Sequence, residues 1–199
     1  MDSDGEDDYS QISKILDLTK KNKEIDVITV NRSSRKESFI FRILYEIHLI
    51  ITFFLTFKYI RYGNFSYLNS KALKFISQKK DLWLAYSASI EKNFQNKKNI
   101  IAARKKRIMG ISKMNYWQLF SHSIKIHLVF IKRIFVNYLF YSLLFILISK
   151  IEILSTITPI FFIFLFIHFL MLVIVKNSGS NIKFNESLKN IDSINILKW

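Results

Sequence analysis

Two long apolar stretches, Ile134–Ser149 (IFVNYLFYSLLFILIS) and Pro159–Val175 (PIFFIFLFIHFLMLVIV), decide the fold of this chain. A helix rises about 1.5 Å per residue, so the two stretches reach about 24 and 26 Å, close to the roughly 30 Å apolar layer of a bilayer. The alternative is a buried helical pair in a soluble domain, but soluble helices rarely run two full turns without a polar face. The pair therefore predicts a transmembrane hairpin over 134–175.

The residues around the two stretches support this hairpin. Thr158 is a good N-cap and Pro159 suits a first helical position, so the second helix is expected to begin there. Lys132 and Arg133 precede the first stretch, and their long side chains can carry the charges out to the headgroups. The polar connection over 150–158 is then the turn between the helices.

A third apolar run covers Phe39–Tyr62 and is less clean, because it contains Arg42 and Glu46. The two charges are four residues apart and are expected to pair on a helix. A charge in the bilayer costs roughly 2.5 kcal/mol or more on insertion scales, so Glu46 needs a partner there. We prefer a transmembrane helix packed against other helices. The alternative is an amphipathic helix that lies on the membrane surface, and the aromatic residues near Tyr62 fit a membrane interface in both cases.

The net charge of +15 is unevenly distributed along the chain. Residues 1–38 hold nine acids and seven bases, whereas residues 61–133 hold sixteen bases and only two acids. Positive segments stay on the side from which a membrane protein is inserted. We therefore expect residues 61–133 and the C-terminal tail on the matrix or cytoplasmic side. With a spanning first helix, the acidic arm would lie on the opposite side, in the intermembrane space of a mitochondrion.

The basic segment is expected to form amphipathic helices. Apolar residues recur at spacings of three and four from Leu82 to Phe94, a helical period. A second helix is predicted to follow over 97–109 and to end at Gly110, and a third, aromatic and basic, over Met114–Phe130. The short apolar patch Ile25–Val30 (IDVITV) in the arm is interpreted as a strand-like contact with a partner, or as part of a disordered tail.

These patterns predict an all-α membrane protein with about three transmembrane helices, a C-terminal hairpin among them, and basic amphipathic helices between the first and second spans. The expected parts are a polar acidic arm (1–38), a first transmembrane or interfacial helix (39–62), a basic helical insert (63–133), the hairpin (134–175) and a short polar tail (176–199).

Clustered bases are the candidate binding site. They could neutralise anionic lipid headgroups such as those of cardiolipin, each base near the membrane being worth about 1 kcal/mol. They could instead bind nucleic acid phosphates, which we consider the weaker hypothesis, or form a solvated face that only sets the topology. The candidate lipid-binding residues are Arg104, Lys105, Lys106, Arg107, Lys125, Lys132 and Arg133.

The sequence predicts no cofactor, metal site or enzyme. His122 and His127 are five residues apart and would point about 140° apart on a helix, so they cannot share an ion. His48 and His168 lie within apolar helices, where haem ligands or quinone contacts occur, but such residues are more often hydrogen-bonded packing residues. The chain has no cysteine and lacks phosphate-loop, zincin and nucleophile-elbow motifs.

Residues 118–127 resemble a short stretch of the proton-channel subunit of rotary ATP synthases. The shared residues are Leu119, Phe120, Ser121 and His127, but the arginine essential in that family corresponds to Gln118. The likeness therefore implies no proton channel.

The function we expect is that of a non-catalytic accessory subunit. In composition, rich in Ile, Phe, Lys and Asn as AT-rich coding produces, the chain is similar to membrane subunits encoded by AT-rich protist mitochondrial genomes. That similarity implies a multi-pass protein of the mitochondrial inner membrane, in a respiratory-chain or ATP-synthase complex, with other membrane subunits and anionic lipid as partners. The alternatives are an endomembrane hairpin protein that shapes or binds lipid, and a haem- or quinone-contacting membrane anchor.

Overall fold

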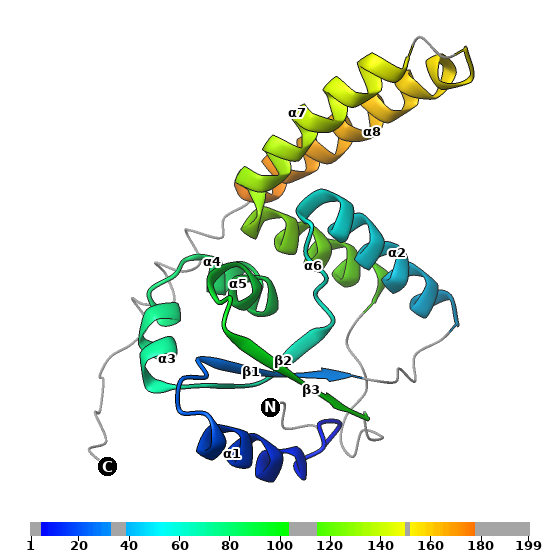
Figure 1. The fold of residues 1–199 in the computed structure, drawn as a ribbon. Helices are drawn as coiled ribbons and strands as arrows, with labels where there is room; N and C mark the ends of the chain where they lie inside the picture. The colour runs from blue at the N-terminus through cyan, green and yellow to red at the C-terminus, as the bar shows by residue number, and fades with distance from the viewer. Residues whose placement is uncertain (1–4, 33–38, 104–114, 150–151, 178–199) are drawn as a thin grey trace. The chain divides into compact units, whose positions relative to one another are not determined.

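The computed structural model describes residues 5–32, 39–103, 115–149 and 152–177 (Figure 1). The chain forms two compact units, Met1–Tyr141 and Ser142–Trp199, and each is described by itself. The elements in chain order are α1 (Gln11–Lys21), β1 (Val27–Arg32), α2 (Phe39–Thr56), β2 (Tyr62–Leu68), α3 (Ser70–Ser77), α4 (Asp81–Leu84), α5 (Tyr86–Asn93), β3 (Lys97–Ala102), α6 (Tyr116–Val129), α7 (Ile131–Ile148) and α8 (Glu152–Asn177).

The first unit contains a three-stranded sheet in the order β2-β1-β3. β1 is antiparallel to β2, with Asn31 opposite Tyr62 and a bulge between Thr29 and Asn31. β1 is parallel to β3, with Val27 opposite Lys97. The central strand thus comes from the acidic arm, and both of its neighbours come from the segment after α2.

This sheet makes the all-α prediction wrong in part: the described chain is mostly helical, but not wholly so. The segment Lys97–Ala102 (KKNIIA) was expected to be helical and is β3. It pairs along its whole length with β1, a distant segment, and such pairing outweighs the local pattern. Similarly, the aromatic stretch assigned to a membrane interface includes β2, and the patch interpreted as a partner contact is β1, which pairs within the chain.

Apolar residues of β1 build the core of the sheet. Ile28 and Val30 are two residues apart and so point to the same face. There they pack with Ile15 of α1 and with Phe65 of β2. α5 lies on the opposite face of the sheet, as Figure 1 shows. The acidic arm is therefore a structural part of this unit, and α1 covers one face of its sheet.

Besides β2 and β3, the segment between α2 and α7 contains short helices, and helix was expected around Leu82–Phe94. The predicted single helix is interrupted at Ala85, whose extended backbone (φ −158°, ψ 114°) separates α4 from α5. The predicted helix over Met114–Phe130 is confirmed as α6. It begins with a capping box, in which Gln118 N donates to Asn115 Oδ1 (2.8 Å) and Asn115 N donates to Gln118 Oε1 (3.1 Å).

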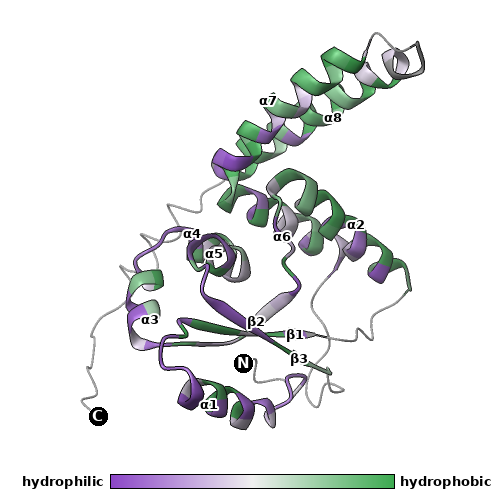
Figure 2. Ribbon diagram, viewed as in Figure 1, coloured by the Kyte–Doolittle hydropathy of each residue, from purple (hydrophilic) through white to green (hydrophobic). Residues whose placement is uncertain are grey.

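Among the described residues, three helices are long and apolar enough to cross a membrane, namely α2, α7 and the Ser155–Lys176 part of α8. Figure 2 shows hydrophobic colour along most of each. They indicate a multi-pass membrane protein. In the second unit, the rings of Phe145 on α7 and Phe161 on α8 stack with centroids 3.9 Å apart, which joins the two helices of the hairpin.

The predicted start of the last helix is wrong. α8 begins at Glu152, so Pro159 lies inside the helix and Thr158 is not its N-cap. Pro159 has no N–H to donate to the carbonyl of Ser155, a loss that helices within membranes tolerate when neighbouring groups replace the bond. Residues 152–158, which we expected to be part of the turn, are therefore helical.

Candidate functional site

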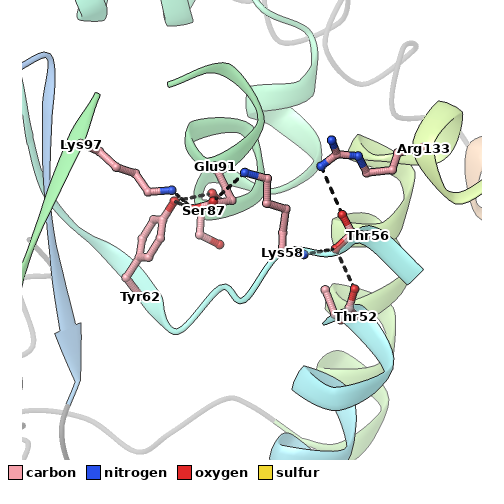
Figure 3. Close-up of polar contacts among 8 residues, drawn as sticks. All are labelled: Thr52, Thr56, Lys58, Tyr62, Ser87, Glu91, Lys97 and Arg133. Carbon is pink, nitrogen blue, oxygen red and sulfur yellow. Dashed lines mark hydrogen bonds and ion pairs between the residues drawn. The ribbon is translucent and has the colours of Figure 1, made fainter. Parts of the chain in front are cut away.

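A buried carboxylate, Glu91 of α5, is the centre of a polar cluster that joins distant segments of the chain (Figure 3). Its side chain is 8% exposed. One oxygen, Oε1, pairs with Lys58 Nζ at 3.4 Å, and the other, Oε2, pairs with Lys97 Nζ of β3. Tyr62 Oη of β2 donates to the same Oε2 (3.3 Å) and to the carbonyl of Ser87 (3.0 Å). Four separate segments therefore meet at one carboxylate.

The electrostatics of this cluster are those of a structural ion pair. Burial, followed by the negative charge of Glu91, raises the pKa of the Tyr62 hydroxyl, so Tyr62 remains a donor at physiological pH. Both carboxylate oxygens already accept from Lys58, Lys97 or Tyr62. Lys58, Lys97 and Tyr62 belong to three segments other than α5. The arrangement holds segments together.

Lys58 extends the cluster to the end of α2. Its backbone N–H donates to Thr56 Oγ1 (3.1 Å), and that hydroxyl donates to the carbonyl of Thr52 (2.6 Å). Arg133 Nη1 of α7 donates to the carbonyl of Thr56 (3.2 Å). We call the connected set the polar joint; its members are Thr52, Thr56, Lys58, Tyr62, Ser87, Glu91, Lys97 and Arg133 (Figure 3).

One stripe of α7 satisfies the carbonyls that end α2. Residues four apart on a helix share a face, and Arg133, Asn137 and Tyr141 follow this spacing. They donate to three successive carbonyls: Arg133 to Thr56 (3.2 Å), Asn137 Nδ2 to Leu55 (2.8 Å) and Tyr141 Oη to Phe54 (2.7 Å). The last carbonyls of a helix have no partner within the helix, and in apolar surroundings no water replaces one. The stripe therefore supplies donors to the carbonyls at the end of α2 and joins it to α7.

A second polar cluster joins α2 to α6. Thr52 Oγ1 lies 2.9 Å from His127 Nε2 and 3.2 Å from His48 Nδ1, and Ser123 Oγ lies 2.8 Å from His48 Nδ1. Thr52 and His127 are almost fully buried. The two imidazoles have centroids 6.0 Å apart. Within the described ranges, no group of three or more His, Asp or Glu side chains could hold a metal ion.

The predicted site residues are scattered. Arg104, Lys105, Lys106 and Arg107 lie outside the described residues. Lys125 of α6 and Lys132 of α7 are exposed. Of the predicted residues, only Arg133 belongs to the polar joint. His168 is buried on α8, in the second unit, with its ring stacked on Phe164 at 6.5 Å.

Sequence reasoning missed the polar joint. Glu91 and Asp81 stand out as the only acids among sixteen bases in residues 61–133, and this was the available signal. Burial of one of them beside two lysines, however, depends on strand pairings between distant segments, which no local pattern shows.

No family model, no curated protein and no solved structure matches this chain.

Proposed function

We propose that the chain is a non-catalytic accessory subunit of a mitochondrial inner-membrane complex, either of the respiratory chain or of the ATP synthase. The observation that supports this most is the extent of unpaired apolar surface on its helices. Side chains on α7 and α8 remain 55% exposed or more at Phe135, Val136, Leu139, Phe140, Leu143, Ile146, Leu147, Ile160, Ile163, Phe166 and Ile174. A monomer rarely exposes so much contiguous apolar surface to water, so lipid and partner helices are expected to cover it.

A scaffolding role agrees with the polar joint. Its charged and hydroxyl groups pair with one another and join the sheet to α2 and α7. These contacts hold the sheet against the helices. A subunit that keeps neighbouring subunits at fixed positions needs such a rigid connection. The helices also lack small-residue faces for tight self-association, because the chain has few Gly and Ala. Bulkier partners are therefore favoured over self-association.

The basic segment supports anionic lipid as a second partner. Lys125 and Lys132 are exposed, and Lys132 is the second residue of α7, where a membrane helix meets the headgroups. Cardiolipin, with two phosphates, is the anionic lipid that this proposal names. The mitochondrial assignment itself rests on composition. Binding of nucleic acid is not part of the proposal.

The third hypothesis, a haem or quinone contact through His48 and His168, has less support. In the first unit, hydroxyl groups of Thr52 and Ser123 lie within hydrogen-bonding distance of His48 Nδ1. This is the environment of a packing histidine. A Soret absorption band in the purified chain that disappears in His168→Ala would favour the cofactor hypothesis instead.

The decisive experiment is a blue-native gel of native membranes solubilised in mild detergent, with mass spectrometry of the band that contains this chain. Co-migration with a respiratory or ATP-synthase complex would support the proposal and name the complex. Migration alone or as a small homo-oligomer would contradict it and favour a hairpin protein that shapes an endomembrane. For the lipid partner, Lys125→Glu/Lys132→Glu should reduce binding to cardiolipin vesicles, whereas Lys20→Glu/Lys21→Glu on α1 serves as the matched charge control.

A further inference from the structure

α2 has two different sides. One side packs into the first unit through its buried residues Tyr45, Leu49, Thr52, Leu55 and Thr56. The opposite side carries large apolar residues that are 39–61% exposed, at Ile40, Ile43, Leu44, Ile47, Ile50 and Phe54. At 100° per residue, these six occupy one arc of the helix, and Arg42 and Glu46 lie beyond one edge of it. We call this arc the exposed apolar side.

The sheet determines how often the chain can cross a membrane between β1 and β2. The two strands are hydrogen-bonded neighbours, so they must lie on the same side of a bilayer, because an open sheet is not stable across the apolar layer. The number of crossings between Arg32 and Tyr62 must therefore be even. The described part of this segment contains one long helix, α2. One crossing would separate paired strands, so α2 makes none.

The path after α2 leads to the same result. Phe57 has a left-handed backbone (φ 53°), which ends the helix and turns the chain back. Four residues later, Arg61 forms an ion pair with Glu46, near the middle of the 18-residue helix. β2 begins at the next residue, Tyr62. If α2 spanned the bilayer, this ion pair and the start of β2 would lie at the bilayer centre, where charges and unpaired strand edges are unfavourable.

The geometry points to α2 as a helix in the plane of one leaflet, with the exposed apolar side against lipid acyl chains, while α7 and α8 are the only described helices that cross. Lipid is the occupant because α7, a crossing helix, starts at the end of α2. Lys132 and Arg133 mark the headgroup level of α7, and Arg133 binds the last carbonyl of α2. An amphipathic helix at this level places its apolar side about 5–10 Å into the leaflet.

Sidedness follows from this arrangement. The acidic arm and the basic segment belong to one sheet and lie on the same side of the membrane, in place of the opposite sides that the charge distribution led us to expect. The turn between α7 and α8 lies on the other side.

Single cysteines test sidedness directly, because the chain has none of its own. Ser13→Cys, Ser77→Cys and Ser155→Cys in the full chain would be treated with a membrane-impermeant maleimide in one preparation of sealed vesicles, before and after detergent. We expect Ser13→Cys and Ser77→Cys to label to the same fraction and Ser155→Cys to label to the complementary fraction. Complementary labelling of Ser13→Cys and Ser77→Cys would show that α2 crosses and would overturn the inference.

Depth measurements identify what covers the exposed apolar side. Nitroxide labels at Ile40, Ile47 and Phe54 have a matched series on α8, at Ile160, Ile167 and Ile174, because each series advances by seven residues, about 10 Å per step along a helix. The ratio of collisions with oxygen to collisions with a water-soluble nickel chelate reports depth. We expect three similar, shallow depths on α2, and a deep middle site between two shallow sites on α8. A deep middle site on α2 would contradict the inference, and α2 labels that collide with neither reagent would show that a protein covers this side instead of lipid.

Discussion

Arg61 Nη2 and Glu46 Oε1 form an ion pair that fastens the start of β2 to the middle of α2. The sequence suggested a different partner, Arg42, one turn away on the same helix. A side chain on the same helix and a side chain on a segment that folds back against it compete for the same carboxylate. The chain reversal at Phe57 brings Arg61 within reach of Glu46.

A double-mutant cycle distinguishes the two pairings. Glu46→Gln with Arg61→Gln should give a coupling free energy of about 0.2–1 kcal/mol, because both side chains are nearly half exposed and solvent weakens the attraction. Thermal unfolding in detergent micelles at low and high salt measures it, and salt should reduce it. The matched cycle with Arg42→Gln should give a smaller coupling; a larger one there would favour the pairing within α2.

Removal of the carboxylate at the centre of the polar joint should destabilise the first unit strongly. Glu91→Ala leaves Lys97 and Tyr62 without their shared acceptor, and a broken buried pair costs about 3–5 kcal/mol when both partners are fully buried. Since Lys97 and Lys58 keep some solvent contact, we expect roughly 2–3 kcal/mol by denaturant unfolding. Glu24→Ala, at an exposed position, should change stability by less than about 0.5 kcal/mol. Equal effects of the two substitutions would rule out a structural role for Glu91.

Tyr62 should make stability depend on pH in the alkaline range. Its pKa is raised above the ordinary value of 10.0 by burial and by Glu91, so the folded state retains a proton that the unfolded state loses. The contribution of Tyr62 is therefore complete below pH 10.0 and is lost as the pH rises above that value. The difference in unfolding free energy between the wild type and Tyr62→Phe should shrink over this range. A difference that stays constant to high pH would contradict a protonated, buried Tyr62.

The donor stripe on α7 predicts that Asn137→Leu is more harmful than its similar volume suggests. Leucine cannot donate to the carbonyl of Leu55, and an unsatisfied buried carbonyl costs about 1–3 kcal/mol. Tyr141→Phe removes a bond at the more exposed end of the stripe and should cost less, about 0.5–1.5 kcal/mol. Thermal unfolding in micelles ranks the two, and the reverse order would show that the carbonyl of Leu55 has another donor.

Thr52 is expected to hold α2 to α6 through its hydroxyl. Thr52→Val keeps the shape but removes the group shared by His48 and His127, at a cost of about 1–3 kcal/mol. Thr52→Ser keeps the hydroxyl and serves as the control, with only the loss of one buried methyl group. Unfolding followed by circular dichroism should separate them; if Thr52→Ser is the less stable variant, packing outweighs the hydrogen bonds.

The helical hairpin could be predicted from sequence because its signal is local. Predominantly apolar composition without charged residues over 16 and 17 residues is sufficient to identify α7 and the apolar part of α8. The start of α8 was misplaced because Thr158-Pro159 is a typical helix start. In the structure, the helix already begins at Glu152, two turns earlier. Local capping preference is worth about 1 kcal/mol, which the surroundings of a helix can outweigh.

The sheet and the polar joint could not be predicted in this way. Lys97–Ala102 begins the longer stretch that we interpreted as a helix over 97–109. Its pairing with β1, whose residues lie seventy positions earlier in the chain, makes it a strand. The charge pattern suggested opposite membrane sides for the arm and the basic segment. The two segments are in fact hydrogen-bonded to each other in the sheet, and no local sequence pattern shows this pairing.

The central place of β1 has a consequence for synthesis. This strand leaves the ribosome before both of its neighbours, and its second edge stays open until β3 has been made. An open apolar strand edge can pair with other chains, so the interval before residue 102 emerges is the period of greatest aggregation risk. The antiparallel β1–β2 pair can close first, around α2, and leave a single edge for β3. Overexpression is therefore expected to fail by aggregation of truncated or slowly translated chains that end before β3, and slower translation after Leu68 should increase that loss.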